Sequence, residues 1–359
     1  MNWFSLPYDN EGIETKTSES IIKQETTIKI LKMNNCGVLY EDHVRFLFNL
    51  MSKNNEKINK NESVSVTLPG YSMISVSALN LKCDDRFSTY FQRICLFLSR
   101  RIHKSGCFSG FPNDNPHIVS VLTAMYAICN IGTEEAYNLI EGDLIYDYLM
   151  SMKRKDGVFY STIGTECDLR STFAALSIAW MINKITPEIT RGVFEYVASC
   201  HNYDGGFSPI PGSESHGGYL FCAIGILCIL DRLGDFDLNK IIRWITSKQD
   251  QFSGGFCGRT NKLVDSCYSW WIGSAAKSIS THLKIPDFWD PDGIDNYTLN
   301  CAQVHSGGFR DSPPSNPDPF HTAYALAGMS VCGKNPTFHS YIPAPNEKVD
   351  KMKYFFTLF

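Results

Sequence analysis

Long hydrophobic runs are absent from this sequence. The longest extends over the twelve residues from Tyr219 to Leu230, whereas a helix that crosses a bilayer requires about 20 apolar residues. We therefore expect this run to form a buried helix, and we expect no stable insertion of the protein into a membrane. Residues Met1 to Asn10 are mixed and partly acidic and lack the apolar core of a secretion signal. Both features predict a cytoplasmic protein.

An excess of charge of one sign is also absent. The 33 Lys and Arg residues nearly balance the 37 Asp and Glu residues, and the net charge is -4 over 359 residues. This balance gives no reason to expect nucleic acid or a membrane surface as a partner. A hydrophobic content of 43% and an aromatic content of 13% suffice for a sizeable core and an apolar pocket. The length fits one large domain or two ordinary ones.

A disulfide framework is not indicated, although the chain has 13 cysteines. Their number is odd, and they are scattered through apolar runs such as those around Cys129 and Cys222. This pattern is typical of buried, reduced thiols in the cytosol.

The most regular feature that is present is a Gly-x-Phe turn, which recurs at intervals of 48 to 53 residues. The turns begin at Gly106, Gly157, Gly205, Gly254 and Gly307. An apolar run with helical character follows each turn, at Val119–Ile131, Ser171–Ile182, Gly218–Leu230, Cys267–Ile279 and His321–Val331. A second, amphipathic run follows most of them, as in Glu188–Cys200 and Leu238–Ser247. Each unit therefore encodes two helices and two loops.

This repeat predicts an all-α protein built from helical hairpins. A single hairpin cannot bury its own apolar face, so neighbouring hairpins must stack. The inner helices are apolar nearly all round, as expected for helices buried on both sides. Five or six hairpins could close into a double ring, an α/α (α6-α6) barrel, and an open solenoid is the alternative. The turn glycines favour closure, because they place tight turns at one rim, where a central cavity would open.

The barrel domain is expected to occupy residues 61–335, with a tail at 336–359. Residues 1–60 are expected to form a peripheral segment. Within it, the stretch Thr15–Lys29 is polar and rich in Lys, Glu and Thr. Asp42–Met51 has a short apolar rhythm that could form a first helix, and Ser52–Ser63 is rich in Lys and Asn and predicts an exposed loop.

A candidate metal centre lies near the start of the fourth apolar run. Asp265 and Cys267 are two residues apart, which separates them by about 200° on a regular helix. At a helix start they can converge, with Asp265 near the N-cap. His321, just before the next inner helix, is the third candidate, and three protein ligands with an open fourth position are typical of catalytic zinc. The alternative is a structural cysteine and a helix-capping histidine.

A group of cationic and hydroxyl side chains accompanies these candidate ligands. Arg259 and Lys262 precede them, and Tyr268 follows. His216 holds the corresponding place in the preceding repeat. If these side chains converge at one rim, they would bind a diphosphate through charge-assisted hydrogen bonds. The alternative is a solvated pair of basic residues in a surface loop.

Aromatic and apolar residues also gather at the starts of the inner helices: Phe173, Tyr219, Cys222, Trp270 and Trp271. They could line an apolar cavity beside the cationic rim. Ordinary core packing is the alternative for each of them.

The chain resembles the β subunits of the CaaX protein prenyltransferases. Four motifs carry the resemblance: Asp168-x-Arg170-Ser171, Glu214-x-His216-Gly217-Gly218-Tyr219-x-Phe221-Cys222, Asn261-Lys262-Leu263-Val264-Asp265-x-Cys267-Tyr268-Ser269-x-Trp271 and Asp318-x-Phe320-His321-Thr322. The resemblance extends from about Thr15 to Val331. It implies an α/α barrel that works as a heterodimer with a helical-repeat α subunit.

The resemblance also implies a role for each site residue. Zinc would be bound by Asp265, Cys267 and His321, which together with Tyr268 form the catalytic group. The diphosphate would be bound by His216, Arg259, Lys262 and Tyr268, and the isoprenoid tunnel would be lined by Arg170, Tyr219, Cys222 and Trp271. The implied reaction joins an isoprenoid to the cysteine of a CaaX sequence at the end of proteins such as small GTPases.

The farnesyl branch fits best over the middle of the chain, as in Asn130–Tyr137. Asp311 matches a carboxylate that this branch associates with magnesium. Three positions depart from it: Thr67 stands at the apparent place of a pocket Trp, while Phe173 and Phe320 replace Tyr. These departures keep a type I geranylgeranyl transferase, or relaxed donor specificity, open as the alternative.

Two other classes of protein fit the sequence less well. A terpene cyclase could use a similar barrel, but the chain contains no Asp-x-Asp-Asp motif. A non-catalytic helical scaffold would have no use for Asp265, Cys267 and His321 together.

Overall fold

A computed structural model describes residues 16–31, 36–57, 66–82, 84–111 and 114–334. Over these residues the regular structure is helical, and β pairing is limited to isolated bridges. The expected tail at 336–359 lies outside the described residues. The all-α fold class is confirmed.

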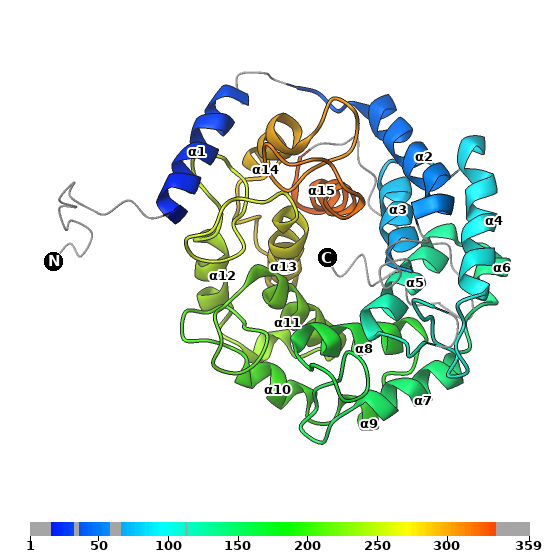
Figure 1. The fold of residues 1–359 in the computed structure, drawn as a ribbon. Helices are drawn as coiled ribbons and strands as arrows, with labels where there is room; N and C mark the ends of the chain where they lie inside the picture. Colours follow the sequence, from blue (N-terminus) through cyan, green and yellow to red (C-terminus); the bar gives the residue numbers. More distant parts are fainter. Residues whose placement is uncertain (1–15, 32–35, 58–65, 83, 112–113, 335–359) are drawn as a thin grey trace.

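The helices form two concentric rings (Figure 1). The inner helices are α3 (Thr67–Ala78), α5 (Ile118–Ile131), α8 (Leu169–Met181), α11 (Gly217–Ile229), α13 (Tyr268–Leu283) and α15 (Pro319–Cys332). Each packs against the next, and α15 packs against α3. This last contact closes the ring, so the structure is a barrel and the open solenoid is ruled out.

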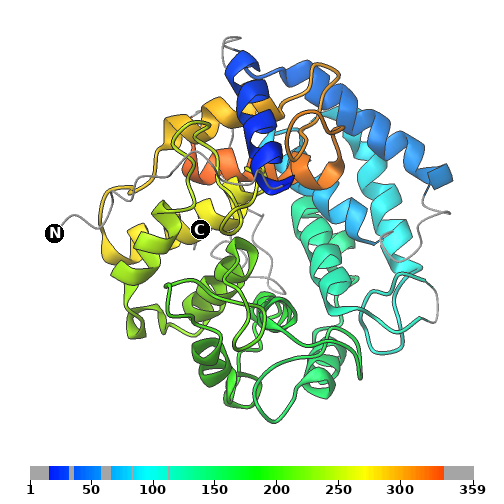
Figure 2. The same cartoon turned by 60° about the vertical axis from the view of Figure 1, so that its left-hand side comes forward.

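An outer helix backs each inner one. The outer helices are α2 (Tyr40–Lys57), α4 (Asp85–Ser99), α7 (Gly142–Met152), α10 (Val193–Ser199), α12 (Leu238–Thr246) and α14 (Pro291–Tyr297). The shorter elements are α6 (Glu134–Tyr137), α9 (Pro187–Thr190), the 3-10 helix η2 (Leu233–Asp235) and the π-helix η3 (Thr298–Ala302). Helix α1 (Lys16–Leu31) lies outside the ring, as the two views in Figures 1 and 2 agree.

Burial follows the sequence pattern of each ring. Along α11 buried positions occupy every side of the helix, from Leu220 to Leu227, because the helix packs on both neighbours and on its outer partner. Helix α12 instead buries one stripe, which includes Leu238, Ile241 and Ile245. These two patterns are those of an inner and an outer helix.

The Gly-x-Phe turns fix the angle between outer and inner helices. Their phenylalanines are almost completely buried, with at most 1% exposure: Phe108, Phe159, Phe207, Phe256 and Phe309. Gly307 has a φ of +87°, and a Cβ there would stand 2.0 Å from the backbone oxygen of Asp42 in α2. Only glycine allows both the left-handed backbone and this contact. The last repeat is thereby packed against the first, which supports ring closure.

Hydrogen bonds join the repeats at the rim that carries these turns. A backbone N–H at or next to the start of an inner helix donates to a loop carbonyl of the following repeat. The pairs are Ile118 to Ser161, Leu169 to Pro209, Gly217 to Gly258 and Ser266 to Asp311, at 2.8 to 3.0 Å. The loops of this rim are therefore held in a fixed order around the barrel mouth.

Three expectations from the sequence were wrong. The run Glu188–Cys200 forms two helices, because Gly192 adopts a φ of +78° between α9 and α10 and packs on Gly157. The first helix begins at Lys16, within the stretch to which no helix was assigned. Helix α2 continues to Lys57, so residues 52–57 are helical, and 58–63 lie outside the described residues.

Among the described residues, the helices are too short or too polar to cross a membrane. The apolar run at Tyr219 lies in α11, which is buried in the inner ring.

Candidate metal centre and adjoining cavities

Three side chains at the barrel mouth form a candidate metal centre. Asp265 and Cys267 lie at the start of α13, and His321 lies in the first turn of the neighbouring α15. One ligand atom from each of them lies within 4.8 Å of the other two. His321 Nε2 is 3.5 Å from Asp265 Oδ1, close to the spacing of about 3.3–3.8 Å between the ligands of a tetrahedral zinc. The donor set and its spacing therefore fit zinc.

The helix start brings Asp265 and Cys267 together. Cys267 occupies the N-cap position of α13, and its backbone N–H donates to Asp265 Oδ1 at 2.8 Å. The chain thus turns between the two residues, and the angular separation of a regular helix does not apply. Ser266, between them, donates its N–H to the carbonyl of Asp311 at 2.9 Å. This bond fixes the pair relative to the next repeat.

Asp318 orients the imidazole of His321. Its Oδ1 caps α15 by accepting the N–H groups of Phe320 and His321. Its Oδ2 lies 2.5 Å from His321 Nδ1, so Nδ1 donates and Nε2 is turned toward Asp265. Such a carboxylate–histidine pair is a common support for a metal-ligating imidazole. Asp318 belongs to one of the four motifs, but no role was expected for it; an Asp three residues before a candidate ligand at a helix start was the available signal.

Protonation of the metal-free centre follows from these contacts. Burial lowers the pKa of His321, but hydrogen bonds and charges from Asp265 and Asp318 outweigh it and raise that pKa to about 10. Burial, reinforced by the Asp265 carboxylate, raises the pKa of the Cys267 thiol well above its usual value. Both groups therefore carry protons at neutral pH, and a metal ion must displace them to bind.

A cationic cavity of about 520 Å³ lies beside this centre. Its lining includes the four residues expected to bind a diphosphate, His216, Arg259, Lys262 and Tyr268, together with Asp265 and Asp311. The structure thus brings together groups from three repeats. The guanidinium of Arg259 is held by Glu214 at 2.8 Å, and both side chains remain about half exposed to solvent. Asp265 and Asp311 add two carboxylates to this otherwise cationic lining.

His216 and Tyr268 form a hydrogen-bonded pair in this cavity. His216 caps α11, with Nδ1 accepting the N–H of Gly218 at 3.0 Å. Burial and the Arg259 charge lower the pKa of His216, which favours the neutral ring with its proton on Nε2. Nε2 lies 3.1 Å from Tyr268 Oη. The ring therefore donates to the hydroxyl oxygen, and the hydroxyl proton of Tyr268 is left to donate to an anion.

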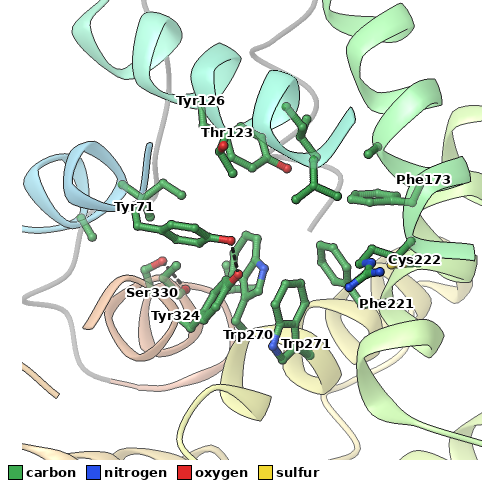
Figure 3. Close-up of a pocket in the computed structure, with 18 of the residues that line it drawn as sticks. Tyr71, Thr123, Tyr126, Phe173, Phe221, Cys222, Trp270, Trp271, Tyr324 and Ser330 are labelled. Atoms are coloured by element: carbon green, nitrogen blue, oxygen red, sulfur yellow. Dashed lines mark hydrogen bonds between the residues drawn. The ribbon is translucent and has the colours of Figure 1, made fainter. Parts of the chain in front are cut away.

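An apolar cavity of about 500 Å³ occupies the barrel centre (Figure 3). Its lining includes the expected residues Arg170, Phe173, Cys222 and Trp271. The cavity extends down three of the inner helices, as far as Ala78, Lys277 and Val331. These are its lining residues: Tyr71, Ile74, Ala78, Val119, Leu122, Thr123, Tyr126, Arg170, Phe173, Ala174, Phe221, Cys222, Trp270, Trp271, Lys277, Tyr324, Ala327, Ser330 and Val331.

Trp271 connects the two parts of the site. It lines the apolar cavity, and its backbone N–H donates to the Cys267 carbonyl at 3.2 Å. Its ring centroid lies 4.5 Å from that of Tyr324, three residues after His321. The candidate metal centre therefore adjoins the upper end of the apolar cavity.

Tyrosines that were not expected from the sequence also line this cavity. Tyr324 donates a hydrogen bond to Tyr71 at 2.7 Å, and Tyr126 lies nearby (Figure 3). Tyr324 follows His321 by one helical turn, a spacing that placed it on the same face. Tyr71 lies outside the four motifs that carry the resemblance, so no signal in the sequence identified it.

Three residues expected in the tunnel lie elsewhere. Thr67 is the first residue of α3, and it does not line the apolar cavity as the structure describes it. Phe320 does not line the cavity itself, but its ring lies 4.8 Å from that of Tyr71, which does. Tyr219 points its hydroxyl toward Asp168 Oδ2 at 3.5 Å and its ring toward His216. Tyr219 lines neither cavity: it lies between His216 of the cationic cavity and Asp168, which pairs with Arg170 of the apolar one.

Comparison with known proteins agrees with the fold. A family profile described as prenyltransferase alpha-alpha toroid domain matches residues 38–358. The structure of Candida albicans protein geranylgeranyltransferase-I complexed with GGPP has a TM-score of 0.73 and covers 89% of this chain and 98% of that one, at 24% sequence identity. At this identity the likeness shows the fold alone.

Two curated relatives are more similar in sequence. The protein farnesyltransferase subunit beta of Schizosaccharomyces pombe is 36% identical over 244 residues, which cover 66% of this chain and 64% of that protein. The geranylgeranyl transferase type-2 subunit beta of Saccharomyces cerevisiae is 31% identical over 236 residues, which cover 64% of this chain and 70% of that protein. The chain thus spans a little under two thirds of the first relative.

The fold and the three-donor centre define a closed α/α toroid with a candidate single-metal site at its mouth. The chain belongs to the prenyltransferase family, as the profile match over most of its length shows. The family expected from the motifs is confirmed.

Proposed function

We propose that this chain is the β subunit of a zinc-dependent protein prenyltransferase. It would transfer a farnesyl group from farnesyl diphosphate to the cysteine thiol of a C-terminal CaaX sequence. One observation carries the proposal: three candidate zinc ligands stand between a cationic cavity and an apolar one. This order suits a donor with a charged head, an apolar tail and a reacting carbon between them.

Zinc would be held by Asp265, Cys267 and His321, whose thiolate, imidazole and carboxylate are all common zinc donors. When bound, the ion supplies a fourth position at which an acceptor thiol is deprotonated near neutral pH. Asp318 holds the His321 ring in the orientation that this requires. A chain with these ligands but no such support would hold its metal less tightly.

The cationic cavity would bind the diphosphate, which is the leaving group. In the transfer, a bond forms between the acceptor sulfur and C1 of the isoprenoid, the C1–oxygen bond breaks, and the diphosphate leaves with the electron pair. Arg259 and Lys262 would neutralise the charge that grows on the diphosphate, and Tyr268 would donate its hydroxyl proton. The thiol proton is released to solvent.

Asp311 is proposed to assist a magnesium ion at the diphosphate. Its buried Oδ1 has no hydrogen-bond partner among the described residues, and the residue lines the cationic cavity. An unsatisfied buried carboxylate oxygen is costly unless a cation or donor approaches it. A magnesium ion shared with the diphosphate would satisfy it.

The apolar cavity would bind the isoprenoid tail. Burial contributes about 0.8 kcal/mol per CH₂, so a further five-carbon unit would add up to about 4 kcal/mol if the cavity accommodated it. A cavity that is too short would instead reject the longer donor. Trp271, Tyr324 and Tyr71 narrow the space next to the metal centre.

A type I geranylgeranyl transferase is the second candidate. One observation favours it: the cavity continues along the inner helices to Lys277 and Val331. A competition assay separates the two. The chain is co-expressed with a prenyltransferase α subunit and offered C15 and C20 diphosphates together with peptides that end in Met, Ser or Leu.

The proposal expects C15 transfer to dominate on the Met and Ser peptides. Dominant C20 transfer to the Leu peptide would establish the second candidate. Absence of transfer from either donor by a folded, zinc-loaded heterodimer would refute both.

A further inference from the structure

Helix α1 reaches the candidate metal centre from outside the ring. It lies along the outer surface in both views (Figures 1 and 2) and contacts η3. Its inward face is formed by Gln24, which is 8% exposed, and Ile28, which is 1% exposed. In contrast, Ile22 and Ile30 on other faces are 53% and 64% exposed. The helix is thus docked through one narrow face that contains a polar side chain.

The amide of Gln24 binds both backbone groups of Val264. Nε2 donates to the Val264 carbonyl at 2.9 Å, and Oε1 accepts the Val264 N–H at 3.2 Å. The reverse orientation of the amide would place donor against donor and acceptor against acceptor, so the chemistry fixes the assignment. One side chain thereby pairs with Val264 as a neighbouring strand would. The two residues are 240 positions apart in the chain.

Val264 is the residue immediately before the candidate ligand Asp265. It is 5% exposed, and its carbonyl also accepts a hydrogen bond from Tyr297 Oη at 3.2 Å. The N–H of Asp265 donates to the Phe256 carbonyl at 3.1 Å. Hydrogen bonds to the backbone of Val264 and Asp265 therefore fix the approach to Asp265 from three directions, and α1 supplies the one from outside the barrel repeats.

The first turns of α1 extend to the cationic cavity as well. Ser20, one turn before Gln24, lines that cavity with Arg259, Lys262 and Tyr268. The helix is therefore next to the diphosphate site and the metal loop at the same time. An anchor that served only to attach α1 could have used apolar side chains such as Ile28.

We propose that Gln24 is a positioning residue for the metal centre. Through its hydrogen bonds to Val264, it fixes the position of the Asp265 carboxylate. The amide holds the loop in the geometry in which Asp265, Cys267 and His321 share one ion. Loss of the amide leaves a buried N–H without a partner, and the loop must shift to satisfy it. The inference rests on the proposed zinc site.

The test uses the full chain co-purified with its α subunit, loaded with zinc or with cobalt as a spectroscopic probe. Gln24→Met keeps the length of the side chain and removes both hydrogen bonds. Gln24→Glu keeps the acceptor but sets a carboxylate oxygen against the Val264 carbonyl, and it serves as a second variant. Ile28→Ala is the matched control, because it weakens the docking of the same helix face without touching Val264.

We expect both Gln24 variants to lose zinc affinity by about 10-fold or more and to shift the visible spectrum of the bound cobalt. We expect Ile28→Ala to keep the parental zinc affinity and cobalt spectrum while its unfolding temperature falls. Parental zinc affinity and spectrum in both Gln24 variants would overturn the inference alone. An equal loss in Ile28→Ala would also overturn it, because docking alone would then explain the effect. A parent that binds neither metal would overturn the zinc site itself.

Discussion

Asp318 Oδ2 lies 2.5 Å from His321 Nδ1, on the opposite side of the ring from the 3.5 Å approach of Nε2 to Asp265. One residue thus caps α15 and orients a candidate ligand. Asp168, which caps α8 through the N–H groups of Arg170 and Ser171, holds the corresponding place in an earlier repeat without a histidine. The two repeats thus share the same Asp helix cap, and the α15 repeat adds a histidine to it.

Asp318→Asn separates these two roles. The amide oxygen can still cap α15, but the amide nitrogen cannot accept the Nδ1 proton of His321. We expect zinc affinity to fall by about 10- to 100-fold with little change in unfolding temperature. Competition with a chromogenic chelator measures the affinity, and Asp168→Asn is the matched control. Unchanged zinc affinity in Asp318→Asn would show that the carboxylate does not support His321.

Zinc binding should release about two protons per chain near pH 8. The sign follows from the raised pKa of His321, at about 10, and of Cys267, well above its usual value, in the metal-free protein. Both groups bind a proton below those pKa values and must give it up to become ligands. The two protonated groups therefore stabilise the metal-free fold at a pH below their pKa values in the unfolded chain. This stabilisation is lost as the pH rises toward their pKa values in the folded protein.

Calorimetry in buffers of different ionisation enthalpy counts these protons. Release of no protons by the parent would mean that the imidazole and thiol are not the ligands.

Ala327→Leu should shorten the apolar cavity. Ala327 lines it on α15, one turn below Tyr324, and is 8% exposed. A larger side chain there is expected to weaken C20 diphosphate binding about 10-fold or more relative to C15, because the tail end loses burial worth about 0.8 kcal/mol per CH₂. Binding of both donors is measured by competition with a fluorescent isoprenoid. Equal weakening of both would mean that Ala327 lies beside the fifteen carbons that the donors share, and unchanged binding of both would place the tail elsewhere.

Asp311→Lys should reduce any magnesium requirement of the transfer. An ammonium group at this cavity wall would take over the charge that a magnesium ion supplies to the diphosphate. Turnover is titrated with magnesium at fixed zinc, and the expected curve is flatter than that of the parent. An unchanged titration would remove Asp311 from the diphosphate site.

Periodicity in the sequence predicted the helices well where both faces are buried. The run Gly218–Leu230 corresponds closely to α11, because a helix inside two rings is apolar on every side. Periodicity failed at α1, whose docking face is narrow and contains Gln24. A polar residue that pairs with backbone 240 positions away leaves no local signal.

The site was predictable where a helix start fixed it. Asp265 and Cys267 were expected to converge at such a start, and the structure places them there. The residues that line the apolar cavity were harder to predict from the sequence. Tyr71 and Tyr324 meet through α3 and α15, the first and last inner helices of the ring. Their contact depends on closure, which the repeat alone could not establish.

Metal analysis of the purified protein tests the central claim most directly. The account predicts one zinc per chain in the parent and none retained by His321→Ala or Cys267→Ala, while both variants still bind isoprenoid diphosphate in the separate cationic and apolar cavities. A folded parent without zinc, or a His321→Ala variant that keeps its zinc and turns over, would contradict it.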